Sequence, residues 1–176
     1  MAGSATEPIR VRPAGVILGG VAVDVVTETV IDRPCAEVAA YAADPSRAPQ
    51  WYVNIVSVRW LTPPPVRVGS RMAFVARFLG RQLAYTYEIV DLVPGQRLVM
   101  RTAQGPFPME TTYTWQADGP DRTRMTLRNR GEPAGFSRLV APFVARAMRH
   151  ANRKDLAALK ARLESGPQRS PDTGGG

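Results

Sequence analysis

The sequence predicts an α+β fold in which a strand, two short helices, a six-stranded antiparallel meander and a long C-terminal helix follow one another along the chain. Two patterns carry this prediction. Over most of residues 54–130, apolar and polar residues alternate with the period of two that is typical of strands with one buried face. In residues 136–164, apolar residues instead recur at intervals of three and four, which is typical of an amphipathic helix.

The composition is that of one ordinary globular domain, with 176 residues of which 44% are hydrophobic and 22% charged. Cys35 is the only cysteine and His150 the only histidine, which excludes an internal disulfide and the common metal centres built from these residue types. We therefore expect neither a metal nor a cofactor. No apolar run reaches the roughly 18 residues that a membrane-spanning helix needs.

The first strand is predicted over residues 24–31, where β-branched residues are dense. Pro34 follows and suits the first position of a helix that continues through residues 35–42, because the first turn of a helix does not use its N–H groups. Asp44 and Pro45 are typical N-cap and first-turn residues, so they predict the start of a second, shorter helix.

Both ends of the chain differ from this middle part in composition. Residues 1–23 are small and polar apart from one short apolar run, and we interpret them as an N-terminal arm or an extra edge strand. An export signal would need a longer apolar core, so we expect a cytoplasmic protein. Residues 24–164 form the predicted domain, and the Gly-, Pro- and Ser-containing residues 165–176 predict a disordered tail.

Six more strands are predicted, at residues 54–61, 70–79, 82–92, 97–103, 109–117 and 122–130. Their connections are short and contain Gly, Pro or Asp, which predicts turns between neighbouring antiparallel strands. The alternation places large apolar side chains on one face of this sheet: Val56, Val58, Trp60, Met72, Phe74, Phe78, Tyr85, Tyr87, Met100, Tyr113, Trp115 and Met125. Arginines, threonines and glutamates fall on the other face, which is typical of a surface in contact with water.

The long helix contains Pro142 near its start, so we expect a turn over residues 136–141 and the main helix from about residue 142. One seam of the helix should face the sheet, and it contains Ala145, Met148, Asn152, Leu156, Leu159 and Leu163. A basic stripe lies beside that seam and contains Arg146, Arg149, Arg153 and Lys160.

A second apolar surface is confined to the start of this helix and contains Phe136, Leu139, Val140, Phe143 and Val144. It has three interpretations. The side chains cap the core, or they form a gate over a ligand cavity, or they make peripheral contact with a membrane while the basic stripe faces anionic head groups.

The chain carries a formal net charge of +8, and residues 136–164 alone hold seven bases and two acids. A charge of this kind raises the question of nucleic-acid binding. Binding of single strands needs aromatic and basic side chains on one surface, whereas the alternation puts them on opposite faces of this sheet. We therefore do not expect a nucleic-acid partner.

The segments that carry a family resemblance are residues 30–38 (VIDRPCAEV), 44–46 (DPS) with Trp51, 68–71 (VGSR), 88–98 (EIVDLVPGQRL) and 121–127 (DRTRMTL). Together they resemble the helix-grip fold of the SRPBCC superfamily, which includes START domains and birch-pollen-allergen-type proteins, and most of all its polyketide cyclase/dehydrase-like branch. The resemblance implies a curved sheet wrapped around the long helix, with a ligand cavity between them. Members of this fold with a Rieske-type oxygenase activity need iron ligands that this chain lacks.

The candidate ligand-binding residues are Trp60, Phe74, Phe78, Tyr85, Tyr87, Tyr113, Asn129, Phe143, Met148 and Asn152. Methionine adapts to varied apolar shapes, and tyrosine combines an apolar ring with a polar hydroxyl. Asn129 and Asn152 are the best candidates to orient a ligand, although structural hydrogen bonds explain them equally well. No pair of acids falls on the apolar face, and His150 lies on the helix face away from the seam, so no catalytic residue is identified.

The leading interpretation is a protein that binds or carries a small hydrophobic molecule, aromatic or lipid-like, between the sheet and the long helix. One alternative is an enzyme, namely a cyclase, aromatase or dehydratase that acts on a polyketide-like substrate. Another is a regulatory or protein-interaction domain that uses the second apolar surface. A buried acid or base would favour the enzyme, and the sequence offers none. The oligomeric state stays open.

Overall fold

The computed structural model describes residues 23–78, 81–105, 108–131 and 141–166 of the chain. In chain order its elements are β1 (Val23–Ile31), α1 (Cys35–Ala42), η1 (Pro45–Gln50), β2 (Ile55–Trp60), β3 (Arg71–Phe78), β4 (Arg81–Val93), β5 (Arg97–Gln104), β6 (Met109–Ala117), β7 (Thr123–Gly131) and α2 (Ala141–Glu164). The order of elements is the predicted one. The predicted N-terminal arm and C-terminal tail lie almost entirely outside the described residues.

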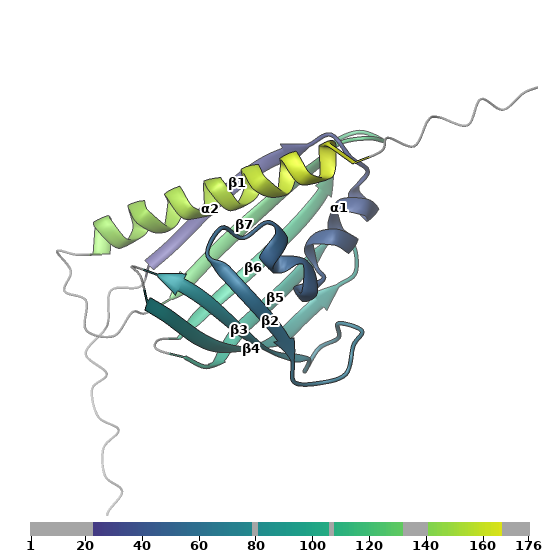
Figure 1. Ribbon diagram of the computed structural model, residues 1–176. Coiled ribbons are helices and arrows are strands. Elements are labelled where there is room, and N and C mark those ends of the chain that lie inside the picture. The colour runs from purple at the N-terminus through teal and green to yellow at the C-terminus, as the bar shows by residue number, and fades with distance from the viewer. Residues whose placement is uncertain (1–22, 79–80, 106–107, 132–140, 167–176) are drawn as a thin grey trace, which may run out of the picture.

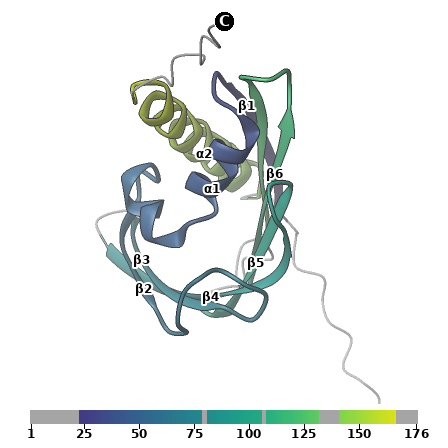
Figure 2. The ribbon, with the colours of Figure 1, turned by 90° about the vertical axis from the view of Figure 1, so that its right-hand side faces the viewer.

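The strands form one antiparallel sheet in the order β1-β7-β6-β5-β4-β3-β2. The sheet is strongly curved, and α2 lies along its concave side, with α1 and η1 beside it (Figures 1 and 2). The strands from β2 to β7 each pair with the next one in the chain, as expected for a meander, and β1 closes the sheet by pairing with β7. The predicted α+β architecture is therefore confirmed.

Proline and aspartate mark the starts of the helices, although Pro34 is the N-cap of α1 and not its first helical residue as predicted. η1 is a 3-10 helix whose N-cap, Asp44, accepts a hydrogen bond from the Ser46 N–H at 2.9 Å. α2 begins at Ala141, which puts Pro142 in its first turn, where the missing N–H has no helical partner to lose.

The face assignment fails at one point, in β2. The alternation predicts Val56 on the apolar face, but its side chain is 46% exposed. The register between β2 and β3 shifts between Ile55 and Ser57, and an extra residue of this kind, a β-bulge, reverses the faces on either side of it. Ile55 therefore packs against the core in place of Val56.

The convex face of the sheet is the polar face that the alternation predicts. Six of its arginines form cross-strand ion pairs, which are Arg71–Glu88, Arg97–Asp91, Arg101–Glu110, Arg124–Glu28, Arg128–Asp24 and Arg130–Asp24. Pairs as exposed as these contribute only about 0–1 kcal/mol each. Their main consequence is that much of the positive charge on this face is already neutralised.

Arg33, which is only 6% exposed, holds the C-terminal end of helix α2. The Nε of Arg33 donates to the Leu163 carbonyl at 2.9 Å, and its Nη2 donates to the carbonyls of Glu164 and Gly166 at 3.2 and 2.7 Å. A guanidinium in this position satisfies carbonyls that a helix end leaves unpaired, and its charge is favourable beside the negative end of the helix dipole. The C-terminal half of α2 is therefore held firmly against the sheet.

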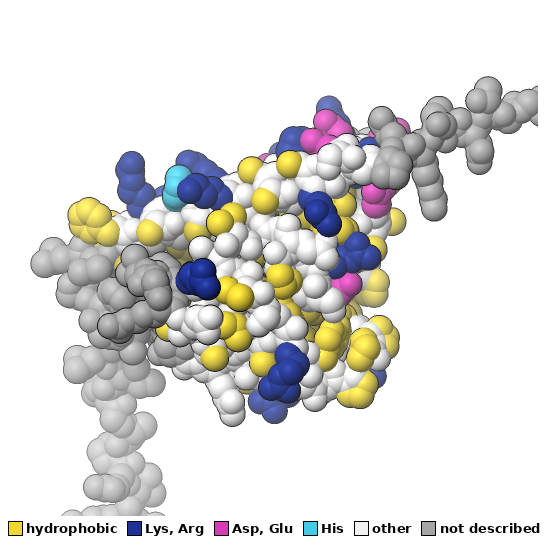
Figure 3. All heavy atoms as spheres, viewed as in Figure 1, with side chains coloured by type: hydrophobic (Ala, Val, Ile, Leu, Met, Phe, Trp, Pro, Cys, Tyr) yellow, Lys and Arg dark blue, Asp and Glu magenta, His cyan; other side chains and the backbone are white. Residues whose placement is uncertain are grey.

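The N-terminal half of α2 is held less tightly. The seam residues Asn152, Leu156, Leu159 and Leu163 are buried, whereas Ala145 and Met148 are only half-buried. On its outer side, α2 exposes Lys and Arg side chains and the single histidine to solvent, as predicted for His150 (Figure 3). A helix with this gradient can separate from the sheet most easily at its N-terminal end.

Candidate functional site

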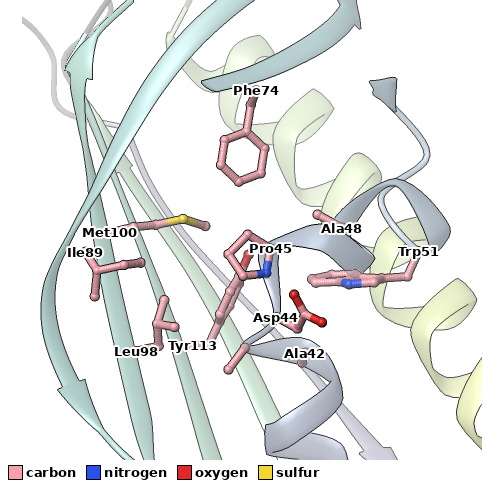
Figure 4. A pocket seen from close by; sticks show the side chains of 11 residues that line it. Ala42, Asp44, Pro45, Ala48, Trp51, Phe74, Ile89, Leu98, Met100 and Tyr113 are labelled. Carbon is pink, nitrogen blue, oxygen red and sulfur yellow. The ribbon is translucent and has the colours of Figure 1, made fainter. Parts of the chain in front are cut away.

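A small, largely apolar pocket lies between the concave face of the sheet and the segment that joins α1 to η1 (Figure 4). Its lining residues are Ala42, Ala43, Asp44, Pro45, Ala48, Trp51, Phe74, Ile89, Leu98, Met100 and Tyr113. The pocket has a volume of about 20 Å³, which is room for about one water molecule. A larger ligand therefore requires side chains to move, and Met100, with its flexible thioether chain, is well suited to do so.

A pair of tyrosines connects the sheet to the segment that follows η1. The hydroxyl oxygens of Tyr52 and Tyr113 are 2.5 Å apart, so one hydroxyl donates a short hydrogen bond to the other. Trp51 stacks on Tyr52, with the ring centroids 4.0 Å apart, and meets Tyr113 edge-on. Burial raises the pKa of both phenols, so both are protonated at neutral pH. Tyr113 thus brings a polar group to the wall of the pocket.

A buried carboxyl group lies near this pair. Asp155 on α2 is 4% exposed, and its Oδ1 accepts a hydrogen bond from the Val53 N–H at 2.9 Å. Removal from water raises the pKa of Asp155 from 3.8 to about 6, and the hydrogen bond from Val53 opposes that rise. The charge of Asp155 in turn helps to raise the pKa of both tyrosines.

Sequence reasoning missed Asp155 and Tyr52. Helical spacing could have found Asp155, because it lies three residues after Asn152 and four before Leu159, both of which belong to the buried seam. Tyr52 follows a short 3-10 helix and precedes β2, where no periodic pattern assigns a side chain to a face. The strand alternation could therefore identify only one half of the tyrosine pair.

A row of hydrogen-bonded polar side chains crosses the concave face from β4 to α2. Its members, called the polar row below, are Tyr87, Thr111, Asn129 and Asn152. The Thr111 hydroxyl donates to Asn129 Oδ1 at 2.8 Å, and Asn129 Nδ2 donates to Asn152 Oδ1 at 3.0 Å. Thr111 also shares a hydrogen bond with Tyr87, whose pKa is raised by burial. Asn152 Nδ2 is buried and has no acceptor among the described residues, so the polar row ends in an unsatisfied donor.

Half of the predicted site residues lie together on the concave side of the sheet. They are Phe74, Tyr87, Tyr113, Asn129 and Asn152, all of which are buried. Phe74 and Tyr113 line the pocket, and the two asparagines are hydrogen-bonded to each other. Tyr85 lies beside Tyr87, with the ring centroids 6.2 Å apart, and is half-buried. The pocket lies between the sheet and the segment that joins α1 to η1, and none of its described lining residues belongs to α2. It therefore does not lie in the space between the sheet and the long helix, where the sequence places the ligand.

The other predicted residues lie apart from this group. Trp60 is half-buried, and its Nε1 donates a hydrogen bond to Ser46 Oγ at 2.8 Å. This hydrogen bond links β2 to η1. Met148 is half-buried on α2, and neither Met148 nor Trp60 lines the pocket in Figure 4. Phe143 is 74% exposed. The side chain of Phe78 and the predicted gate residues Phe136, Leu139 and Val140 lie outside the described part of the chain.

Within the described residues, His, Cys, Asp and Glu side chains do not gather in groups of three or more that could hold a metal ion. In the same part of the chain, no helix has both the length and the apolar character that crossing a bilayer requires.

A family model described as polyketide cyclase/dehydrase and lipid transport matches residues 22–164 of the chain. None of the curated protein sequences matches it. The family match therefore covers the whole of the described sheet and α2.

Several solved structures share the fold. A protein from Thermus thermophilus has 21% sequence identity and a TM-score of 0.70, over 81% of this chain and 99% of that one. A START superfamily protein from Mycobacterium smegmatis has 17% identity and a TM-score of 0.71, over 80% of this chain and 97% of that one. An aromatase/cyclase from a Streptomyces species has 17% identity and a TM-score of 0.68, over 81% of this chain and 94% of that one. At these identities the likeness concerns the fold, and it confirms the helix-grip arrangement.

Proposed function

The chain belongs to the polyketide cyclase/dehydrase and lipid transport family, and from this premise we propose that it binds a small hydrophobic molecule on the concave side of its sheet. The ligand would be aromatic or lipid-like and would carry at least one hydrogen-bond acceptor, such as a carbonyl or hydroxyl oxygen. The observation that carries this proposal is the polar row, which ends in the Nδ2 of Asn152, a donor that has no acceptor in the described part of the chain.

A buried donor without an acceptor costs about 1–3 kcal/mol. Each neighbour of Asn152 in the polar row has a partner, so the open position is confined to one atom, Nδ2. If the polar row only joined β7 to α2, an apolar side chain at its end would avoid the cost of a buried, unpaired donor. An acceptor on a ligand would complete the row, which makes Asn152 the residue best placed to orient that ligand.

Room for the ligand would come from movement of side chains and of the less tightly held end of α2. The pocket has a volume of about 20 Å³ when empty. Three methionines, Met72, Met100 and Met125, contribute to the core on this face, and thioether side chains repack at low cost. Because Ala145 and Met148 are only half-buried, the N-terminal half of α2 is the natural entrance.

The test is a direct search for the ligand. Native mass spectrometry of the purified protein should detect a co-purified small molecule, and a fluorescent apolar dye should bind and be displaced by that molecule. A protein that carries no ligand and binds no apolar dye would refute the proposal.

The Asn152→Leu variant is expected to bind the ligand about 3- to 10-fold more weakly, since one hydrogen bond is worth about 0.5–1.5 kcal/mol. The control is Thr27→Val, because the Thr27 hydroxyl is another buried polar group without a partner among the described residues, but it lies on β1, outside the polar row. Thr27→Val should leave the affinity unchanged. Equal affinities for both variants and the wild type would mean that the polar row has a structural role only.

A second prediction tests whether Phe143, as part of the second apolar surface, belongs to a gate over the ligand site. Phe143→Ala should change the free energy of unfolding by less than about 0.5 kcal/mol, because exposed side chains contribute little to stability. As part of a gate, the phenyl ring should nevertheless affect ligand affinity several-fold. A dye titration and a thermal melt of both proteins compare the two effects. Unchanged affinity, whatever the effect on stability, would mean that the phenyl ring takes no part in a gate.

A second candidate function, that of an enzyme acting on a polyketide-like substrate, is favoured by Asp155. A carboxyl group whose pKa lies at about 6 can both accept and release a proton near neutral pH. Cyclisation followed by loss of water needs a base that removes a proton next to a carbonyl group, and a donor that stabilises the carbonyl oxygen. Asp155 would be the base, and the Tyr52–Tyr113 pair would be the donor. Asp155→Asn separates the two functions, because it removes the base and leaves the tyrosine pair in place.

A further inference from the structure

The outer side of the N-terminal half of α2 carries basic side chains that ligand binding inside the sheet does not use (Figure 3). Arg146, Arg149, His150 and Arg153, called the basic patch below, line a shallow groove with a volume of about 260 Å³. All four residues are exposed. Because they lie three, four and seven residues apart, they form one continuous stripe along the helix.

The basic patch differs from the convex face of the sheet because no acidic side chain of the described residues pairs with its arginines. There, six arginines are paired with acidic side chains across neighbouring strands. Among the described residues, Arg146, Arg149 and Arg153 form no ion pair. Lys160, which the sequence analysis places in the same stripe, is instead bonded to Glu164 and to the Val30 carbonyl. The three arginines of the patch thus form a compact cluster of cations without ion pairs among the described residues.

The charge distribution of this part of α2 is unfavourable for the helix itself. Residues 141–154 contain four arginines and lysines and no acid, a formal charge of +4. Like charges three or four residues apart repel each other, and positive charges in the first turns oppose the helix dipole. The first turn contains no acidic residue that would offset this repulsion. The patch therefore becomes favourable only beside an external source of negative charge.

Phe143 extends the stripe in the N-terminal direction. It lies three residues before Arg146. With 74% of its surface exposed, Phe143 is the most exposed large hydrophobic residue in the described part of the chain. An exposed aromatic ring at the end of a stripe of cations is the arrangement of helices that lie in the interface of a membrane, where the ring enters the acyl boundary and the cations meet the head groups.

We propose that this face of α2 docks on membranes that contain anionic lipids, with the basic patch on the lipid head groups and Phe143 in the interfacial layer. Nucleic acid fits these residues less well, because bases stack on aromatic rings placed among the basic groups, and the basic patch itself contains no Phe, Tyr or Trp. Membranes also hold the water-insoluble molecules that the proposed function requires, although docking does not depend on that function.

The experiment is sedimentation of the full chain with vesicles of phosphatidylcholine alone and of phosphatidylcholine mixed with phosphatidylserine. Binding should require phosphatidylserine and should weaken as salt is added. Each arginine beside an anionic membrane strengthens binding roughly fivefold, so the triple variant R146Q/R149Q/R153Q should bind about a hundredfold more weakly. Phe143→Ala should weaken binding several-fold and leave the salt dependence unchanged.

The matched control is R59Q/R67Q/R77Q, which removes the same charge from three exposed arginines that form no ion pair among the described residues and lie outside α2. It should bind nearly as well as the wild type. Equal losses in both triple variants would overturn the proposal, because net charge alone would then account for binding. So would wild-type binding to neither kind of vesicle, or tighter, patch-dependent binding to duplex DNA than to phosphatidylserine vesicles.

Discussion

Replacing Trp115 with alanine should lower the free energy of unfolding by about 3–5 kcal/mol, the range for large-to-small substitutions of buried aromatic residues. Trp115 lies on β6 and is 3% exposed, with its ring centroid 5.9 Å from that of Tyr113. Its indole Nε1 has no partner among the described residues, so the substitution breaks no side-chain hydrogen bond there. The whole loss should therefore come from removed packing and from the cavity left behind. Denaturant unfolding followed by circular dichroism measures it.

Trp60→Ala is the control for the Trp115 variant. Trp60 is half-buried near one edge of the sheet and donates one hydrogen bond, to Ser46, so its removal should cost clearly less than that of Trp115. An unchanged unfolding midpoint for Trp115→Ala would mean that the face assignment of β6 is wrong. Thr111 and Tyr113 share that face, so the polar row and the tyrosine pair would then lose their place inside the molecule.

The bounds of the strands could be predicted closely because each strand has one buried face. The predicted strand at residues 109–117 coincides with β6, and the other predicted strands differ from those observed by one residue at each end at most. Turn residues between them limit how far a strand can extend. The alternation of residue types does not reveal where a strand contains an extra residue. The bulge beside Ser57, which turns Val56 toward solvent, could therefore not be predicted from the sequence.

The candidate site could be predicted only in part, since periodicity assigns faces and not partners. It predicted that Asn129 faces the long helix and that Asn152 faces the sheet. It could not predict the hydrogen bond between them, or that Asn152 Nδ2 has no acceptor among the described residues. The pocket is formed partly by Trp51 and by the residues before η1, whose positions depend on how that segment folds over the sheet. Contacts of this kind arise from tertiary packing, which no local pattern encodes.

Asp155 gives the second large effect, a loss of stability as the pH rises. The pKa of its carboxyl group is about 6 in the folded protein and 3.8 in its ordinary state. At a pH between these two pKa values, Asp155 is ionised in the unfolded chain but still protonated in the folded protein. Raising the pH through this range therefore favours unfolding. The contribution of Asp155 to stability is therefore fully present below about pH 4 and is lost as the pH passes through 6. The loss amounts to roughly 3 kcal/mol.

Asp155→Asn isolates this effect, because the asparagine Oδ1 can still accept the Val53 N–H while the charge is gone. The variant should match the wild type in stability near pH 4 and exceed it by about 2–3 kcal/mol near pH 8. Denaturant unfolding of both proteins at a series of pH values measures the difference. The carboxyl groups of Asp24 and Glu164, whose pKa values are lowered by ion pairs and hydrogen bonds, titrate in both proteins and cancel. A difference that does not vary with pH would show that the Asp155 carboxylate remains solvated.

The same variant separates the two candidate functions. A buried charge that lowers stability at neutral pH is typical of residues retained for activity, since active sites trade stability for function. If the protein only binds its ligand, Asp155→Asn should be more stable and should bind the apolar ligand within about twofold of the wild type, because the polar row and the tyrosine pair stay intact. If Asp155 is a catalytic base, the variant should keep that affinity but convert a linear poly-β-ketone to aromatic product about 100- to 10,000-fold more slowly. Absorbance of the aromatic product and a dye-displacement titration on the same samples distinguish the two outcomes.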